Sequence, residues 1–249
     1  MSILGVIPSR FNSSRFPGKP LVDIAGKSMI QRVYEQARKS AVLNDLIVAT
    51  DDRRIFDHVI AFGGKVILTS PEHNNGTERC AETIELLKQS YDFVINIQGD
   101  EPFIKHEQID LLGQGFKGET KLATLVKFET ERELYDSPHE IKVTVSNQGK
   151  ALYFSRSPIP HFKNTFDFKG FYKHIGTYAY RTDVLKKVVG LPPSKLELAE
   201  SLEQLRWLEN GYEIEIVETH EDSLSIDTPE DLERVKRLQG QIEGDDFTD

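Results

Sequence analysis

Residues 3–20, which read ILGVIPSRFNSSRFPGKP, join a short apolar run to a long loop. The run 3–7 has the length and the residue types of a buried strand, and the next helical pattern begins only after Ser28. About twenty residues therefore separate strand and helix, and connections of that length inside a compact domain are usually functional or disordered. The stretch predicts a β-strand that leads into a functional loop.

The loop at 8–20 carries three cationic side chains. Arg10, Arg15 and Lys19 are five and four residues apart and can all face one anion, such as a triphosphate. A solvated surface loop is the alternative, but three prolines and a glycine stiffen this backbone, and a tether has no need of stiffness. We therefore interpret the segment as an anion-binding loop.

Two common phosphate-binding signatures receive no support. The pattern Gly-x-Gly-x-x-Gly does not follow the first strand, which removes the main support for a nicotinamide or flavin oxidoreductase. Gly26, Lys27 and Ser28 resemble the end of a P-loop, but Leu21 stands where that motif needs its first glycine. Any phosphate is expected to be held by side-chain cations more than by a glycine-rich backbone.

The composition favours a globular chain that acts on small molecules. The 249 residues are 38% hydrophobic, and the net charge of −9 argues against nonspecific binding to nucleic acid or membranes. Cys80 is the only cysteine, which excludes an intrachain disulfide and suits a reducing compartment. No apolar run approaches ~18 residues, and no signal-peptide pattern precedes Arg10. We expect a cytoplasmic protein without membrane insertion.

Strand and helix patterns alternate through the first half of the chain. Strands are predicted at 3–7, 46–50, 65–69 and 93–97, and helices at 28–39, 53–62, 77–87 and 107–112. This alternation predicts an α/β fold in which helices cover both faces of a parallel sheet. Ligands gather at the carboxyl ends of such strands, so the loops 8–20, 70–77 and 98–102 are expected to meet.

The second half departs from that alternation. Strands are predicted at 122–128, 141–145, 151–154, 174–180 and 213–218, and helices at 196–210 and 229–238. We interpret 122–172 as a smaller mixed-strand insertion, involved in dimerisation, within a single domain of residues 1–249. The acidic tail 243–249 is expected to be disordered.

Two carboxylates are candidate magnesium ligands. Asp100 follows the strand at 93–97 within the sequence QGDEP, where an α/β enzyme commonly holds a hard cation. Asp227 is free to join it if Thr228 caps the following helix with Asp231 at the third position. Two carboxylates and phosphate oxygens suit Mg²⁺. The alternatives are an acidic turn for Asp100 and a helix cap for Asp227.

Other polar residues follow the remaining strands. Asn74 to Arg79 lie between a strand and a helix, where they either read a base edge or form a capping loop. Arg156 ends a predicted strand and can hold a carboxylate, although an isolated arginine is more often a surface residue. His174 and Tyr178 share one strand face, with Glu203 and Gln204 in a predicted helix; structural roles are the alternative for each. Neither His106-Glu107 nor His139-Glu140 has the second histidine that a zinc-protease helix requires.

Taken together, the motifs resemble the 3-deoxy-manno-octulosonate cytidylyltransferase family, or CMP-KDO synthetases, over nearly the whole chain. The resemblance is carried, in order, by IPSRFNSSRFPGKPL, NGTER, NIQGDEP, ALYFSR, HIGTYAYR, LEQLR and IDTPEDL. Three positions depart from the family pattern: Ser9 replaces the usual Ala, Asn75 the usual Ser, and Ser28 the usual Pro.

The resemblance implies a three-layer nucleotide-diphosphosugar-transferase fold, a homodimer, Mg²⁺ as cofactor, and a role in lipopolysaccharide biosynthesis. It also implies that the anomeric hydroxyl of KDO attacks the α-phosphorus of CTP, giving CMP-KDO and pyrophosphate. The implied nucleotide-binding residues are Arg10, Arg15, Lys19, Gly76, Arg79 and Gln98, and Arg10, Lys19, Asp100 and Asp227 are the implied catalytic residues, with the two aspartates holding the metal. The implied sugar-binding residues are Arg156, His174, Tyr178, Glu203 and Gln204.

Other functions stay open at this point. A sister enzyme that activates 8-amino KDO or a sialic acid is the nearest alternative, and a catalytically silent nucleotide-binding regulator is another. The presence of both Asp100 and Asp227 argues against the silent regulator.

Overall fold

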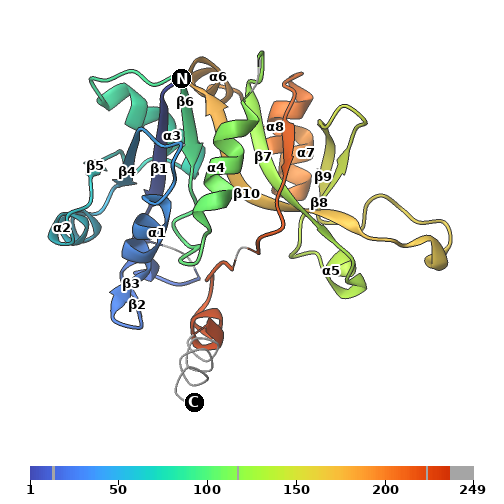
Figure 1. Ribbon diagram of the computed structural model, residues 1–249, viewed down its shortest axis with the longest axis horizontal. Coiled ribbons are helices and arrows are strands. Elements are labelled where there is room, and N and C mark those ends of the chain that lie inside the picture. The colour runs from blue at the N-terminus through green and yellow to red at the C-terminus, as the bar shows by residue number, and fades with distance from the viewer. Residues whose placement is uncertain (13–14, 117, 223, 236–249) are drawn as a thin grey trace.

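The computed structural model describes residues 1–12, 15–116, 118–222 and 224–235, which form a nine-stranded mixed sheet, a two-stranded hairpin and the helices around them (Figure 1). The strands are β1 (Ile3–Ser9), β2 (Asp23–Ile24), β3 (Lys27–Ser28), β4 (Asp45–Thr50), β5 (Val66–Leu68), β6 (Phe93–Asn96), β7 (Leu122–Glu129), β8 (Lys142–Val145), β9 (Ala151–Ser155), β10 (Phe171–Arg181) and β11 (Glu215–Glu218). The α-helices are α1 (Met29–Ala37), α2 (Arg53–Ala61), α3 (Gly76–Leu86), α4 (His106–Gly115), α5 (Arg132–Asp136), α6 (Thr182–Val188), α7 (Lys195–Glu200) and α8 (Gln204–Glu209). Two 3-10 turns, η1 (Lys19–Leu21) and η2 (Thr165–Asp167), and a helical segment at 229–235 complete the described chain.

The main sheet has the strand order β11-β7-β10-β6-β1-β4-β5, and β8 and β9 pair beside β10. β1 runs parallel to β4 and β6, and β4 runs parallel to β5, as the alternation in the first half predicts. The sheet becomes mixed at β10, which is antiparallel to both β6 and β7. The carboxyl ends of β1 and β6 therefore lie side by side.

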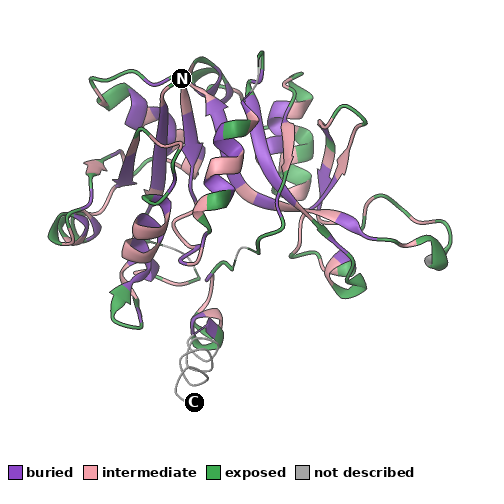
Figure 2. Cartoon of the chain, in the orientation of Figure 1, coloured by how far each residue is buried: buried purple, intermediate pink, exposed green. Residues whose placement is uncertain are grey.

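Each face of the sheet has its own hydrophobic core. In β1, Leu4 and Val6 belong to a cluster with α3, α6 and α8, whereas Ile3 and Ile7 belong to a cluster with α1, α2 and α4. Figure 2 shows buried residues along the central strands and exposed residues on the outer sides of the helices. This arrangement confirms the predicted three-layer α/β/α architecture.

The long connection after β1 contains short structure of its own. It holds η1 and the β2–β3 hairpin before α1 begins, and Ser28 caps α1 by accepting a hydrogen bond at Oγ from the Gln31 amide at 3.3 Å. The helix therefore begins directly after Ser28, the position where the predicted helix 28–39 starts. Within the stretch 122–172, β7 lies in the main strand order, whereas β8 and β9 lie beside it.

The prediction of one helix at 196–210 is wrong. Ser201 has a left-handed backbone (φ 54°), and its amide and that of Leu202 both donate to the Glu197 carbonyl, which ends α7 before α8 begins. Leu198, which helical spacing would place on one face with Leu202 and Leu205, is 70% exposed, whereas those two are buried. The structure also contains α5 and α6, which the sequence patterns do not predict.

A third cluster fixes the last described segment. Ile226, Leu232 and Val235 pack with Ile24 and Met29, next to the β2–β3 hairpin. The segment therefore lies against the opening loop. Among the described residues, no helix is long and apolar enough to cross a bilayer. The tail predicted to be disordered, 243–249, lies outside the described residues.

Candidate active site

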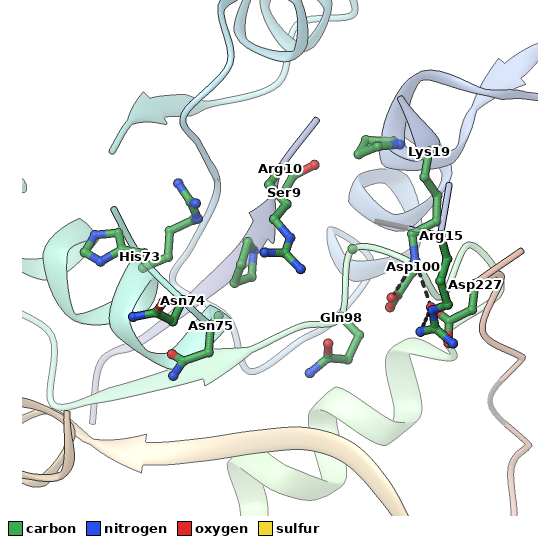
Figure 3. Close-up of a pocket in the computed structure, with 15 residues that line it drawn as sticks. Ser9, Arg10, Arg15, Lys19, His73, Asn74, Asn75, Gln98, Asp100 and Asp227 are labelled. Carbon is green, nitrogen blue, oxygen red and sulfur yellow. Dashed lines mark hydrogen bonds and ion pairs between the residues drawn. The ribbon is translucent and has the colours of Figure 1, made fainter. Parts of the chain in front are cut away.

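A cavity of about 260 Å³ opens at the carboxyl ends of β1 and β6, beside the first turn of α3 (Figure 3). We call it the loop cavity. It is lined by Pro8, Ser9, Arg10, Arg15, Lys19, Pro20, His73, Asn74, Asn75, Gly76, Arg79, Gln98, Gly99, Asp100 and Asp227. The loops 8–20, 70–77 and 98–102 thus meet, as expected for loops at the carboxyl ends of strands in a parallel sheet.

Two glycines allow these loops to approach one another closely. A Cβ atom on Gly99 would lie 2.7 Å from the backbone oxygen of Pro8, and one on Gly76 would lie 3.3 Å from the Pro8 ring. Backbone oxygen cannot move aside as a flexible side chain does, so a larger residue at 99 would separate the loops. The close packing brings the end of β1 against the QGDEP segment.

Cations from the opening loop meet two distant carboxylates. The buried Lys19 donates from Nζ to Asp100 Oδ2 at 2.9 Å and to Asp227 Oδ1 at 3.1 Å. Arg15 Nη2 lies 3.1 Å from the same Asp227 oxygen. Arg10 lines the cavity with an exposed side chain, and no carboxylate in the described ranges lies within ion-pairing distance of it. The cavity therefore contains a cationic side chain free to bind an anion, that of Arg10, and an ion cluster of Arg15, Lys19, Asp100 and Asp227.

The segment 224–235 places Asp227 in this cluster. The Ile226 amide donates to the Asp100 carbonyl at 2.9 Å, which ties the two acidic segments together. Thr228 and Asp231 exchange hydrogen bonds, with the Asp231 amide donating to Thr228 Oγ1 at 3.2 Å and the Thr228 amide donating to Asp231 Oδ2 at 3.0 Å. The predicted capping box is confirmed, and the Asp227 carboxylate stays outside it.

The Asp100 and Asp227 carboxylates suit a hard divalent cation. Their oxygens contact one ammonium nitrogen, so they are close enough to share one cation. No cluster of three or more potential metal-binding side chains occurs among the described residues. Mg²⁺ commonly uses one or two protein carboxylates with substrate phosphates and waters, so the pair fits Mg²⁺.

The α3 side of the cavity is built from capping contacts. Asn75 Oδ1 accepts from the Glu78 amide at 2.8 Å, and Asn75 Nδ2 donates to Glu78 Oε1 at 3.2 Å. The Asn74 amide donates to Glu78 Oε2 at 2.8 Å. The capping alternative is therefore confirmed for Asn75, and Gly76, the first residue of α3, lines the cavity.

Arg79 is 3% exposed and anchors this wall from within. Its guanidinium donates to Thr69 Oγ1, to the Ser70 carbonyl at 3.3 Å and to Asp51 Oδ2 at 3.2 Å. Arg79 lines the cavity as predicted for a nucleotide-binding residue, and these partners connect the loop after β5 to the end of β4.

Sequence reasoning missed the lining residue His73, and it named Ser9 only as a departure from the family pattern. His73 Nε2 lies 2.5 Å from Glu82 Oε2, which also accepts from the Ser70 amide at 2.7 Å, so the pair fastens the loop to α3. Ser9 Oγ is buried and has no hydrogen-bond partner in the described part of the chain. Only their places in loops already singled out could have indicated these residues, because no periodicity marks them.

The predicted sugar-binding residues form a second group, which we call the β10 cluster: Arg156, His174, Tyr178, Glu203 and Gln204. None of them lines the loop cavity. Two contacts connect the groups: Gln98 Nε2 donates to the Gly176 carbonyl at 2.6 Å, and Thr77 Oγ1 donates to Glu203 Oε2 at 2.9 Å. The cluster therefore adjoins the cavity through β10 and α3.

Of the β10 residues of the cluster, Tyr178 is buried and His174 half-buried, and both side chains are neutral at physiological pH. His174 Nε2 lies 3.0 Å from Thr124 Oγ1, and burial lowers the pKa of His174 to about 3. The His174 and Tyr178 rings lie 5.3 Å apart, and burial raises the Tyr178 pKa well above its usual value. The Tyr178 hydroxyl has no hydrogen-bond partner of ordinary geometry among the described residues. A ligand hydroxyl could satisfy it.

Glu203 and Gln204 start α8 and bring further polar groups to the same place. Burial raises the pKa of Glu203 to about 7, against the opposing effect of its hydrogen bond from Thr77. Gln204 is buried, and no partner for its Nε2 occurs in the described ranges. Arg156 donates from Nε to the Glu200 carbonyl at 2.8 Å, so its guanidinium is anchored to the end of α7 rather than isolated on the surface.

Comparisons with known proteins agree with this architecture. A sequence model of the cytidylyltransferase family matches residues 4–217. Proteins named 3-deoxy-manno-octulosonate cytidylyltransferase from Cytophaga hutchinsonii and Parabacteroides distasonis are 51% and 50% identical to this chain, each over 94% of this chain and 96% of its own length.

Solved structures give the same picture. CMP:2-keto-3-deoxy-manno-octonic acid synthetase complexed with CTP superposes with a TM-score of 0.91 at 43% identity, over 97% of this chain and 99% of that one. A 4-diphosphocytidyl-2C-methyl-D-erythritol synthase from Anaerococcus prevotii shares the fold, with a TM-score of 0.64 at 12% identity over 96% of this chain and 98% of its own. The predicted fold class is confirmed.

Proposed function

The chain belongs to the 3-deoxy-manno-octulosonate cytidylyltransferase family, and on this basis we propose that it activates KDO with CTP, releasing CMP-KDO and pyrophosphate. The anomeric hydroxyl of KDO attacks the α-phosphorus of CTP, and the bond from that phosphorus to the pyrophosphate oxygen breaks. Water or a basic group accepts the hydroxyl proton.

The observation that carries the proposal is the ion cluster of the loop cavity. Lys19 lies 2.9 Å from Asp100 and 3.1 Å from Asp227, next to the exposed Arg10 and the first turn of α3. Phosphoryl transfer depends mainly on positioning and on neutralising charge, and such a cluster supplies both. We propose Arg10, Arg15 and Lys19 as the triphosphate-binding residues.

Asp100 and Asp227 would hold Mg²⁺, which neutralises charge on the phosphate oxygens when it is bound. Gly76, Arg79 and Gln98 would surround the cytidine, since all three line the loop cavity. The β10 cluster would hold the sugar acid, because its buried hydroxyl and amide groups can pair with sugar hydroxyls. Gln98, which donates to the Gly176 carbonyl on β10, would hold the two substrates in a fixed position relative to each other.

Three further properties belong to the same proposal. We propose that the protein works in the cytoplasm, that it supplies lipopolysaccharide biosynthesis, and that it forms a homodimer through the region 122–172. An exposed Phe128 (43%) in contact with Tyr172 (ring centroids 5.3 Å apart) supports an interface there. Sedimentation equilibrium at micromolar concentration would test the dimer.

Pyrophosphate release tests the reaction. The purified chain is incubated with CTP and Mg²⁺ and with KDO, 8-amino KDO or a sialic acid in turn. We expect release with KDO to exceed release with the other acids. Faster release with 8-amino KDO or a sialic acid would support the sister enzyme instead, and tight CTP binding without release for any acid would support the silent regulator.

A further inference from the structure

Arg156, at the end of β9, is held at nearly every polar atom by other segments. Its amide donates to Glu200 Oε2 at 2.9 Å, its Nε donates to the Glu200 carbonyl at 2.8 Å, and its Nη1 donates to the Pro138 carbonyl at 3.2 Å. Its carbonyl accepts from Lys142 Nζ. Both the backbone and the base of the guanidinium are therefore fixed.

Lys142, on β8, is fully buried and has no role in the reaction as proposed. Its ammonium donates to the carbonyls of Ser137 (2.8 Å), Glu140 (2.7 Å) and Arg156. An ammonium has three donors, and here each has an acceptor. Burial lowers the pKa of Lys142, so the carbonyl contacts compensate for a costly location. Because Ser137 and Glu140 flank Pro138, Lys142 fixes both the backbone of Arg156 and the loop that accepts from its guanidinium.

Glu200, the last residue of α7, connects Arg156 to α8. Its carboxylate accepts from Ser155 Oγ at 2.6 Å and from the Arg156 amide at 2.9 Å. The left-handed Ser201 follows directly, and two residues later Glu203 and Gln204 begin the next helix. The contacts of Glu200 thus fix the turn that delivers the α8 residues to the β10 cluster.

We propose that Lys142 and Glu200 are positioning residues for the sugar-acid site, and that they act by fixing Arg156 so that its free Nη2 group receives the carboxylate of the sugar acid. The inference rests on the proposed function of the β10 cluster. Nε and Nη1 of Arg156 each donate one hydrogen bond to a carbonyl, and in the described ranges no acceptor is bonded to Nη2. A guanidinium fixed in advance loses less side-chain freedom when a carboxylate binds.

The test uses the isosteric variant Glu200→Gln and measures KM for KDO, KM for CTP and kcat by pyrophosphate release. An amide at 200 places an NH₂ group where the Ser155 hydroxyl or the Arg156 amide now donates. We expect KM for KDO to rise at least about tenfold, which corresponds to about 1.4 kcal/mol, with KM for CTP within about threefold of wild type. A merely structural role would lower thermal stability without separating the two KM values.

A matched control and a double mutant complete the design. Asp110 on α4 also fastens a loop, accepting from Ser40 Oγ (2.6 Å) and from the amides of residues 41 and 42 (2.9 and 3.3 Å), outside the cavity and the cluster. Asp110→Asn is expected to lower thermal stability while leaving both KM values unchanged. In an Arg156→Ala background, Glu200→Gln is expected to change KM for KDO by less than about twofold further, because coupled residues are not additive.

The outcomes separate the inference from the proposed function. If wild type releases no pyrophosphate with any sugar acid, the proposed function fails. If wild type turns over KDO but Glu200→Gln keeps its KM for KDO, or if the effects of Glu200→Gln and Arg156→Ala simply add, the positioning role is wrong. Lys142→Met provides a second variant with the same expected KM split, and circular dichroism shows whether it folds.

Discussion

The loop cavity and the β10 cluster adjoin each other but bind by different means. The cavity gathers formal charges, with Lys19 between Asp100 and Asp227 and the exposed Arg10 beside them. The cluster has one guanidinium, that of Arg156, beside largely buried groups with little charge of their own: His174 is uncharged at physiological pH, the pKa of Glu203 is about 7, and the Tyr178 hydroxyl is protonated. We propose that the two regions serve two substrates by different means, the cavity by neutralising several phosphate charges and the cluster by pairing one guanidinium with a carboxylate among uncharged hydrogen-bonding groups.

The two regions should also differ in which changes affect them. Interactions between exposed charges weaken with added salt and with the loss of a single charge. A buried group instead has a shifted pKa, so pH affects the stability of the fold through the ionisation of that group. The four predictions below test this contrast, beginning with the largest expected effect.

Removing one carboxylate from the loop cavity is expected to have the largest effect. Asp100→Ala should lower kcat in the pyrophosphate assay by about 100-fold or more at saturating Mg²⁺, because the variant loses charge stabilisation at the reacting phosphate. Asp52→Ala, which removes an aspartate that caps α2 outside the cavity, serves as the control. Turnover of Asp100→Ala within about tenfold of wild type would show that Asp100 has no metal role.

The neutral character of the β10 cluster predicts a pH effect on stability. Below about pH 4.5 Glu203 is protonated in both states, but between about pH 4.5 and 7 it ionises first in the unfolded chain, so wild type loses stability as pH rises. Glu203→Gln removes that loss and keeps an oxygen to accept from Thr77. We expect the variant to gain up to about 3 kcal/mol relative to wild type at pH 8, and close to nothing near pH 4.

Urea unfolding of both proteins from pH 4 to pH 8 measures this difference. A difference that stays constant across the range would mean that Glu203 ionises in the folded chain as freely as in the unfolded chain. Burial in the β10 cluster would then not raise the pKa of Glu203.

The glycine at 99 tests whether the cavity depends on close loop packing. A Cβ atom at 99 would lie 2.7 Å from the Pro8 oxygen, so Gly99→Ala should push the loops apart at a cost of about 1–3 kcal/mol. We expect kcat/KM for CTP to fall by about tenfold or more. Gly63 has open space for a Cβ atom, but its positive φ would strain an alanine, so it is a poor control. Gly190→Ala, on a surface turn without a positive φ, is the better control. Unchanged kcat/KM in Gly99→Ala would show that the loops accommodate the methyl group.

The smallest effect is expected at Arg15. Its side chain is 64% exposed, and exposed ion pairs contribute at most about 1 kcal/mol. Arg15→Ala should raise KM for CTP about threefold at low ionic strength and less at 0.5 M salt, because salt screens an exposed charge. Initial-rate measurements at two salt concentrations test this. A loss as large as that of Asp100→Ala, unaffected by salt, would place Arg15 among the essential groups.

The sequence predicted the loop cavity because its geometry follows from topology. Once β1 and β6 are recognised as parallel strands, their carboxyl ends must lie together, and the loop with Arg10 and Lys19 must meet the one with Asp100. The role of Thr228 as the helix cap was predicted from local spacing, and that freed Asp227 to join the cluster.

Features that depend on long-range packing were not predicted. The break at Ser201 interrupts a regular pattern of leucines, because α7 ends through backbone hydrogen bonds that periodicity does not reveal. His73 meets Glu82 across a turn, and Lys142 meets carbonyls of separate segments. Histidine, glutamate and lysine are common on protein surfaces, so the sequence alone does not indicate which of them pair or with what. The three-dimensional structure is needed to identify the partners.

Asp227 follows every strand of the described sheet, and the hydrophobic cluster that holds it uses residues after β11. During synthesis on the ribosome, both sheet cores can therefore assemble before the second acidic group has emerged. A polypeptide terminated just after β11 would have all nine strands and the opening cationic loop, yet it would lack half of the acidic pair. Such a product is expected to turn over little, because the acidic pair beside Lys19 would be incomplete.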